Sequence, residues 1–308
     1  MRSPHWWTTS SAKVTDDGQG APSEGGRRLA GRRINYATSF DDPWRQAFVR
    51  SVEWLTGKVT VLRMVRAYER AGPARGQAFW GAALAAQGIR VTTPNAQIVR
   101  IPASGPVVLV ANHPHGLVDG MVLADLIGRR RSDYKILSRA LLTDLDPEAS
   151  RFLIPVPFPH HADAQARMIK MRRAAMAHLE QGGLLALFPA GVVATAPRMF
   201  GPVIEAEWHV FTAKLIRLSG ASVVPCYFHG ANSRGYQIAN SFSALLRQSL
   251  LLHEVARTRN TDFAPVVGEP VCAADIAARM HDPRAAMAWL RALTLGLGQR
   301  VGTGTSPR

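Results

Sequence analysis

The chain has 308 residues, of which 47% are hydrophobic and 19% charged, as is ordinary for a folded protein with a sizeable core. Lysine and arginine number 37 against 22 acidic residues, and the formal net charge of +15 predicts anionic partners. No zinc-finger spacing, clear helix-turn-helix or aromatic RNA-binding motif is present, so we expect no specific nucleic acid. A non-enzymatic basic binding protein is therefore the weakest hypothesis. The sequence also lacks a secretory signal pattern and a run of ~18–20 apolar residues, which predicts a cytoplasmic or peripheral location.

The N-terminal third contains two regions of different character. Residues 1–38 are rich in Ser, Thr, Gly and Arg without apolar periodicity, which predicts a disordered basic tail. Residues 39–88 are predicted to be helical, beginning at the N-cap candidate Asp42 with an amphipathic pair of helices. The apolar residues at helical spacing in the first helix are Trp44, Phe48, Val52 and Leu55. With its interleaved arginines, the pair is either a membrane anchor or a helical layer packed on the core.

From residue 89 to about 300, apolar runs alternate with helical stretches. Strands are predicted at 97–101, 107–111, 135–138, 184–188, 223–228 and 264–268. Helices are predicted at 117–129, 163–181, 208–218, 237–256 and 283–297. This alternation indicates an α/β domain with a central mixed sheet flanked by helices. Ligands in such sheets bind beyond the carboxyl ends of strands, which places residues 112–119 and 189–192 at the expected site.

The segment Asn112-His-Pro-His-Gly-Leu-Val-Asp-Gly120 directly follows the predicted strand at 107–111. A histidine at a strand end with a carboxylate nearby can act as a general base whose ring is oriented by that carboxylate. His113 is the candidate base and Asp119 its partner. Five residues separate them, so their contact depends on the turn from Pro114 to Gly116.

Two further segments carry weaker signals. Phe188-Pro-Ala-Gly191 ends another buried strand, and glycine there lets the backbone approach a ligand, with amides near it as donors to a developing oxyanion. Ala221-Ser-Val-Val-Pro-Cys-Tyr227 is a third apolar strand, followed closely by Asn232 and Arg234.

Taken together, the three segments resemble the signatures of the glycerolipid and lysophospholipid acyltransferase superfamily, in the same order and at similar intervals. The first is most similar to the hemolysin-like branch, which reads Asn-His-Pro-x-Gly-x-x-Asp-Gly. The residues that match are Asn112, His113, Pro114, Gly116, Asp119 and Gly120. The resemblance covers about residues 90–270 and implies acyl transfer from acyl-CoA or acyl carrier protein to a lysolipid hydroxyl.

In that family the commonest spacing is His-x4-Asp, and the Phe-Pro-x-Gly segment commonly carries Glu and then Thr-Arg. Here Ala190, Val192 and Val193 stand at those positions. The missing arginine argues against a glycerol-3-phosphate acceptor and favours a bulkier lysolipid or aminolipid, because arginine would pair with the phosphate.

The resemblance and the residue chemistry together predict the members of the site. His113 and Asp119 are the expected catalytic pair. The expected substrate-binding residues are Asn112, His115, Gly116, Arg139, Phe188, Pro189, Ala190, Gly191, Asn232 and Arg234. Neither a metal nor a cofactor is expected apart from the acyl donor. The expected partners are an anionic membrane surface, the lysolipid and acyl carrier protein, with the enzyme peripheral on the cytoplasmic face of the inner membrane.

A metal-dependent hydrolase is the alternative. His113-x-His115 after a hydrophobic strand, together with Asp119, resembles the opening ligands of such enzymes, and imidazole with carboxylate suits Zn²⁺. The remaining ligands are not evident in the sequence.

Overall fold

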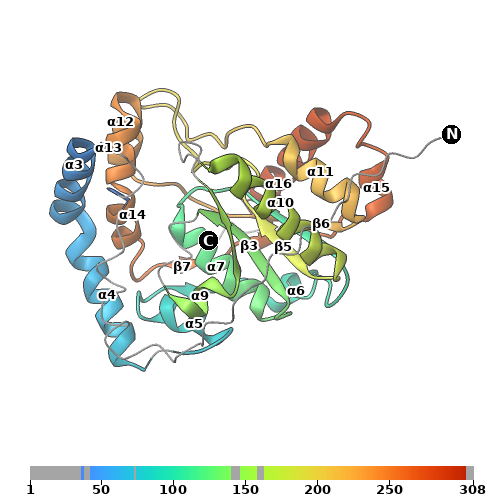
Figure 1. The fold of residues 1–308 in the computed structure, drawn as a ribbon, viewed down its shortest axis with the longest axis horizontal. Coiled ribbons are helices and arrows are strands. Elements are labelled where there is room, and N and C mark those ends of the chain that lie inside the picture. The colour runs from blue at the N-terminus through green and yellow to red at the C-terminus, as the bar shows by residue number, and fades with distance from the viewer. Residues whose placement is uncertain (1–35, 38–41, 73, 140–145, 158–162, 303–308) are drawn as a thin grey trace, which may run out of the picture.

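A computed structural model describes residues 36–37, 42–72, 74–139, 146–157 and 163–302. Its centre is a six-stranded sheet in the order β4-β3-β5-β2-β6-β8. Strands β3, β5 and β6 of this sheet are labelled in Figure 1. Five strands run parallel and β8 pairs antiparallel with β6, so the sheet is mixed as predicted. The strands are β2 (Val107–Ala111), β3 (Tyr134–Arg139), β4 (Leu153–Val156), β5 (Leu184–Leu187), β6 (Ser222–Tyr227) and β8 (Val266–Val267); β1 (Arg90–Val91) and β7 (Asp262–Phe263) form a separate parallel pair.

The central strand β2 is paired on both sides, with Val107 opposite Leu184 of β5 and Ser222 of β6. All five of its residues are fully buried. Because side chains alternate along a strand, Leu109 enters one hydrophobic cluster and Val108 enters the other. The cores on the two faces of the sheet therefore meet at β2, which gives the residues at its carboxyl end a rigid base.

Helices cover both faces of the sheet. The first cluster joins β2 to α4, α5, α7 and α14, and the second joins it to α10, α11, α15 and α16. In Figure 1, α3 and α4 run along the left edge beside α12–α14, and α11, α15 and α16 lie on the opposite side. The helices are α3 (Pro43–Glu53), η2 (Trp54–Lys58), α4 (Val59–Arg70), α5 (Ala78–Ala85), α6 (Asn95–Ile98), α7 (Leu117–Gly128), α9 (Pro147–Ser150), α10 (Ala164–Glu180), α11 (Val210–Ser219), α12 (Arg234–Phe242), α13 (Ala244–Ser249), α14 (Leu251–Arg257), α15 (Ala273–Ala277) and α16 (Pro283–Gly302).

Two predicted elements differ from the structure, and one strand of the central sheet was not predicted. The strand expected at 97–101 is instead the short helix α6, and the Gln97 side chain accepts a hydrogen bond from the Val267 amide at the edge of β8. The long helix expected at 237–256 is divided into α12, α13 and α14. Strand β4 was not predicted. The tail predicted for residues 1–38 lies outside the described residues except for Tyr36 and Ala37.

The two N-terminal helices form one continuous helical rod from Pro43 to Arg70. Asp42 caps it as predicted, accepting a hydrogen bond from the Trp44 amide at 3.1 Å. The π-helical turn η2 joins α3 to α4, and the residues at both junctions keep right-handed helical angles. The expected pair of helices is therefore present as α3 and α4, joined end to end in a single rod. None of the described helices is both long and apolar enough to cross a bilayer.

The rod has two distinct faces. Its packed face carries Val49, Glu53, Gly57, Val61 and Met64, and the last two belong to the core around β2. Its other face exposes the large apolar side chains Trp44, Phe48, Trp54, Leu55 and Val59. Trp44 is 83% exposed and Leu55 is 86% exposed, so the apolar stripe predicted from the sequence faces solvent instead of the core. The rod thus packs on the domain and still offers an apolar surface.

Gly57 lies against the backbone of α14, and we expect Gly57→Ala to lower the free energy of unfolding by about 1–3 kcal/mol. A Cβ atom there would lie 2.6 Å from the carbonyl carbon and oxygen of Leu252, and backbone cannot swing aside as a flexible side chain can. Chemical denaturation measures the effect. Gly296→Ala is the matched control, because a Cβ atom on that α16 glycine meets nothing within 4 Å, and it should gain about 0.5–1 kcal/mol. Equal stability of Gly57→Ala and the wild type would contradict the close packing.

Candidate active site

The predicted motif lies at the carboxyl end of β2, between β5 and β6. Asn112 and His113 directly follow the strand, and Leu117 begins α7 four residues later. Phe188 follows β5, and Phe228 follows β6. The three segments singled out in the sequence therefore meet at one edge of the sheet, where open α/β sheets place their ligands.

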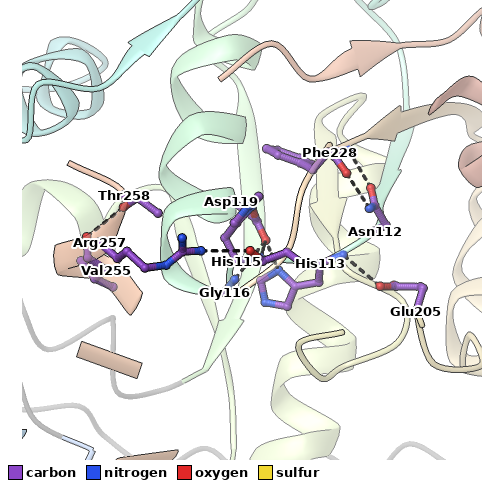
Figure 2. A network of polar contacts seen from close by, with 11 residues as sticks. Asn112, His113, His115, Gly116, Asp119, Glu205, Phe228, Val255, Arg257 and Thr258 are labelled. Atoms are coloured by element: carbon purple, nitrogen blue, oxygen red, sulfur yellow. Dashed lines mark hydrogen bonds and ion pairs between the residues drawn. The ribbon is translucent and has the colours of Figure 1, made fainter. Parts of the chain in front are cut away.

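Asp119 is the centre of this edge, and Figure 2 shows that both motif histidines converge on it. The carboxylate is fully buried. Its Oδ2 atom lies 3.0 Å from His113 Nδ1, and its Oδ1 atom lies 2.9 Å from His115 Nδ1. Because an ionised carboxylate only accepts hydrogen bonds, we assign a proton to Nδ1 of each ring. Nε2 of each neutral ring is then an acceptor, as a general base requires.

The turn from Pro114 to Gly116 brings His113 to Asp119 across the five intervening residues. Gly116 adopts φ 82° and ψ −125°, a conformation that strongly favours glycine. The amides of His115 and Gly116 donate to Asp119 Oδ2 at 2.8 and 3.0 Å, while the Asp119 amide donates to Gly116 O. Asp119 thus caps the start of α7 and orients His113 with the same carboxylate.

The surroundings of Asp119 favour its ionised form. Burial by itself raises the pKa of this carboxyl group, but the hydrogen bonds from His113 and His115 outweigh burial and hold the pKa below its ordinary value. Asp119 therefore carries a negative charge at neutral pH. The negative charge of Asp119 beside Nδ1 stabilises an imidazolium, the form that His113 takes when it accepts a proton.

The ring and backbone of His113 are also held from other directions. Its ring stacks on Phe188, with the ring centroids 3.9 Å apart. Its carbonyl accepts a hydrogen bond from the Ala194 amide at 2.8 Å, and its amide donates to Glu205 Oε2 at 3.1 Å. His113 remains partly open, with 17% of its side chain exposed. The histidine is therefore fixed in position but still accessible.

Asn112 joins β2 to the segment after β6. Its side-chain nitrogen donates to Phe228 O at 2.9 Å, and its side-chain oxygen accepts from Phe228 N at 2.7 Å (Figure 2). This pair of hydrogen bonds continues the pairing between the two strands past their ends. The amide of Asn112, predicted to bind substrate, thus has a structural partner.

The Phe188–Gly191 segment forms a tight turn after β5. Gly191 has φ 66°, and its amide donates to Phe188 O at 2.9 Å, so this amide is engaged within the turn. Arg139, at the end of β3, donates to Gly191 O at 3.2 Å. Ala190 is buried in the second hydrophobic cluster, and Pro189 O accepts from the His209 amide. The structure brings Arg139 to this turn, and its role in substrate binding stays a prediction.

Asn232 and Arg234 lie on the segment that follows Phe228. Asn232 is buried, and neither polar atom of its side chain meets a hydrogen-bond partner among the described residues. Arg234 begins α12 with an exposed side chain that donates to Gly201 O at 2.9 Å. A substrate-binding role for either residue stays a prediction.

Comparison with known proteins gives the family. A family model for acyltransferases matches residues 61–257, which is more than half of the chain and includes all three motif segments. The chain belongs to this acyltransferase family. Its membership confirms the resemblance to the glycerolipid acyltransferase superfamily.

Two curated relatives match this acyltransferase-family chain. They are lyso-glycine lipid O-acyltransferases of Phocaeicola vulgatus, 29% identical over 180 residues, and of Bacteroides thetaiotaomicron, 31% identical over 184 residues. Each alignment covers 56% of this chain, and they cover 61% and 64% of the respective relatives, so the chain spans about three fifths of their length. Among solved structures, 1-acyl-sn-glycerophosphate (LPA) acyltransferase, PlsC, from Thermotoga maritima is 13% identical with a TM-score of 0.49, covering 92% of this chain and 98% of that chain.

The geometry of the family motif does not resemble a metal centre. Within the described ranges, no group of three or more His, Cys, Asp or Glu residues is placed to hold a metal ion. The alternative hydrolase requires His113, His115 and Asp119 to share an ion, whereas both Nδ1 atoms are hydrogen-bonded to the carboxylate itself. These contacts favour the orienting role of Asp119.

The sequence did not predict Glu205 in the site. It lies 92 residues after His113 in the chain, belongs to none of the three motif segments and is buried against the His113 amide. Burial raises the pKa of its carboxyl group, while the hydrogen bonds from His113 N and Trp208 Nε1 oppose that rise. An isolated glutamate in a loop gives no signal in one sequence, so only the fold identifies this contact.

Proposed function

We propose that the protein transfers a fatty acyl group from an acyl thioester, acyl-CoA or acyl carrier protein, to the hydroxyl group of a lysolipid. The observation that carries the proposal is the 3.0 Å hydrogen bond between His113 Nδ1 and the buried Asp119 carboxylate. Since Nδ1 is committed to Asp119, Nε2 is the ring nitrogen left for the acceptor hydroxyl. A positioned histidine base of this kind contributes about 10²- to 10⁴-fold to a rate.

The reaction needs no covalent enzyme intermediate. His113 Nε2 removes the hydroxyl proton as the acceptor oxygen attacks the thioester carbonyl carbon. The new carbon–oxygen bond forms, the carbon–sulfur bond breaks, and the imidazolium returns its proton to the departing thiolate. Asp119 stabilises the imidazolium between these two transfers. The products are an ester and a free thiol, and the enzyme is regenerated.

A lysolipid with an amino-acid headgroup is the acceptor class that we favour. The two curated relatives are named lyso-glycine lipid O-acyltransferases. In this chain Val192 and Val193 occupy positions where the superfamily commonly carries Thr and Arg after the Phe-Pro-x-Gly segment. An apolar turn there suits an acceptor that lacks a terminal phosphate better than it suits glycerol-3-phosphate.

Product analysis tests the proposal. The purified protein is incubated with palmitoyl-CoA or palmitoyl acyl carrier protein and with lyso-glycine lipid, lysophosphatidic acid or glycerol-3-phosphate. We expect thiol release that depends on lyso-glycine lipid, with an equal amount of doubly acylated product by mass spectrometry. Thiol release without acylated lipid would indicate thioester hydrolysis and overturn the transfer.

The exposed face of the rod supports a second part of the proposal, peripheral binding to an anionic membrane. Trp44, Phe48, Leu55 and Val59 are spaced at i, i+4, i+11 and i+15, which places them on one side of a helix. Exposed arginines lie on the same rod: Arg45, Arg50, Arg63, Arg66 and Arg70. Apolar side chains that enter the interface beside cations that meet lipid headgroups are the features of an interfacial helix. The cytoplasmic face of the inner membrane is the side that we propose.

The rod is also connected to the site. The backbone of α14 contacts Gly57, and Leu251 at the start of α14 lies 3.9 Å from the Cβ position of Gly116. Docking the rod on a membrane would therefore fix the distance between the surface and His113.

A further inference from the structure

We propose that Glu205 is a positioning residue for His113, holding its backbone and placing a second negative charge beside the imidazole. This inference deepens the proposed acyl transfer and rests on it. Glu205 is 6% exposed, and its carboxylate accepts two hydrogen bonds: from His113 N to Oε2 and from Trp208 Nε1 to Oε1, each at 3.1 Å.

The loop between β5 and α11 holds the peptide of His113 on two sides. Ala194 donates to the His113 carbonyl, and Glu205 accepts from the His113 amide. The two parts of the loop are joined between these contacts, because Thr195 and Ile204 exchange backbone hydrogen bonds at 3.3 and 3.0 Å. The backbone of His113 is therefore held by one cross-linked part of the loop, and Asp119 holds the His113 ring.

Helix α16 supports the same loop. The guanidinium of Arg291 donates to the backbone oxygens of Glu205 and Ala206. Arg291 thus holds the backbone at Glu205, while the Glu205 side-chain carboxylate remains directed to His113 and Trp208. The charged or titratable groups that face Glu205 are His113 from the turn after β2 and Arg291 from α16; Asp119 acts on the same imidazole from α7.

Keeping a carboxylate at this position costs stability. Burial raises the pKa of Glu205 above its ordinary value, so the folded protein binds a proton more readily than the unfolded chain. Stability from this group is fully present below the ordinary glutamate pKa and is lost as pH rises through the raised value. A buried carboxyl group with a raised pKa, hydrogen-bonded to the backbone of the candidate base, indicates a functional role because such groups cluster at active sites.

Two pairs of variants separate the charge from the hydrogen bond. Glu205→Ala removes both. Gln at 205 would turn its amide nitrogen toward one of the two donors, so the charge is tested in a Trp208→Phe background, where the indole donor is absent. In Trp208→Phe/Glu205→Gln, the amide oxygen accepts from His113 N and only the charge is lost. Trp208→Phe alone is the matched reference.

We expect Glu205→Ala to lower kcat by about 10- to 100-fold with little change in KM, as supporting residues around active sites do. Relative to Trp208→Phe, the double variant should lower kcat by about tenfold and move the acidic limb of the kcat/KM pH profile to lower pH. The direction follows because removing a negative charge makes the imidazolium harder to form. Identical kcat and identical pH profiles in the double variant and Trp208→Phe would overturn the inference.

The wild type and His113→Ala are measured in the same assay, so that the two proposals fail separately. An active wild type with unaffected Glu205 variants would overturn only the positioning role. An inactive wild type would overturn the proposed function, and NMR titration of the His113 ring would then decide the inference. Its midpoint should be lower in the double variant than in Trp208→Phe, and coincident midpoints would overturn the positioning role.

Discussion

Replacing Asp119 with asparagine is expected to lower kcat for acyl transfer by about 10⁴-fold, the loss that follows when an orienting carboxylate of a histidine base becomes an amide. Asp119 accepts from two imidazoles and two backbone amides in the structure. Asparagine has one acceptor oxygen and a donor nitrogen, so it cannot satisfy all four. An amide nitrogen facing His113 would also favour the wrong tautomer, with the proton on Nε2. Initial rates of acceptor-dependent thiol release measure the loss.

Asp125→Asn is the matched control, because Asp125 lies on the same helix α7 and its carboxylate pairs at 2.6 Å with Arg129, whose side chain is partly exposed. Asparagine keeps an acceptor oxygen for Arg129, and partly exposed pairs contribute about 0–1 kcal/mol, so the control should keep both its activity and its fold. Equal activity of Asp119→Asn and Asp125→Asn would show that the carboxylate does not orient the base.

The stability of Asp119→Asn should also depend on pH in a defined direction. The pKa of Asp119 in the folded protein lies below its ordinary value. The stabilisation that this charge provides is therefore present above the ordinary aspartate pKa and lost as pH falls through the folded value. We expect the stability difference between the wild type and Asp119→Asn to be largest at neutral pH and to shrink in acid. Denaturation at several pH values measures it.

Replacing both Trp44 and Leu55 with aspartate is expected to weaken binding to anionic liposomes by about a hundredfold. The two side chains are more than four fifths exposed, so the fold loses little. Burying each in the interface contributes about 1.5–3 kcal/mol, and a total of about 3 kcal/mol corresponds to two orders of magnitude in partitioning. Co-sedimentation with liposomes measures the change. Substitution tests membrane binding more specifically than deletion of the rod does, because deletion would also remove Val61 and Met64 from the core.

Leu218→Asp provides the control for an added acidic residue. Leu218 is also an exposed leucine, but it lies on α11, on the opposite side of the molecule from α3 in Figure 1. Its substitution should leave liposome binding unchanged. Undiminished binding by the Trp44/Leu55 double variant would mean that another surface contacts the membrane. Binding of the wild type should also weaken with added salt, because the arginines on the rod interact with charged headgroups.

Much of the fold was predictable because its central strands are continuous apolar runs. β2, β5 and β6 are buried on both faces, so each strand can be recognised from its own apolar sequence, without knowledge of the strands beside it. Edge elements were harder. β4 is four residues long with Pro155 inside it, and the apolar residues at 97–101 form a helical turn docked on β8 through Gln97. These segments take their structure from tertiary contacts that local propensity does not reveal.

The site was predictable to the extent that it is local. His113, His115 and Asp119 lie within seven residues, so a single turn brings them together. Glu205 and the engagement of Asn112 with Phe228 depend on contacts between distant segments. The two faces of the rod could not be assigned because Glu53 and Gly57, which pack inward, appear polar or neutral in the sequence, and because large apolar residues lie on both faces.

The most direct test is the rate of acceptor-dependent thiol release by His113→Gln, with an unchanged unfolding temperature as evidence of an intact fold. If His113 is the general base, kcat should fall by about 10²- to 10⁴-fold while the variant still binds its lipid acceptor. A folded His113→Gln protein that transfers acyl groups at a rate close to that of the wild type would contradict a catalytic role for His113.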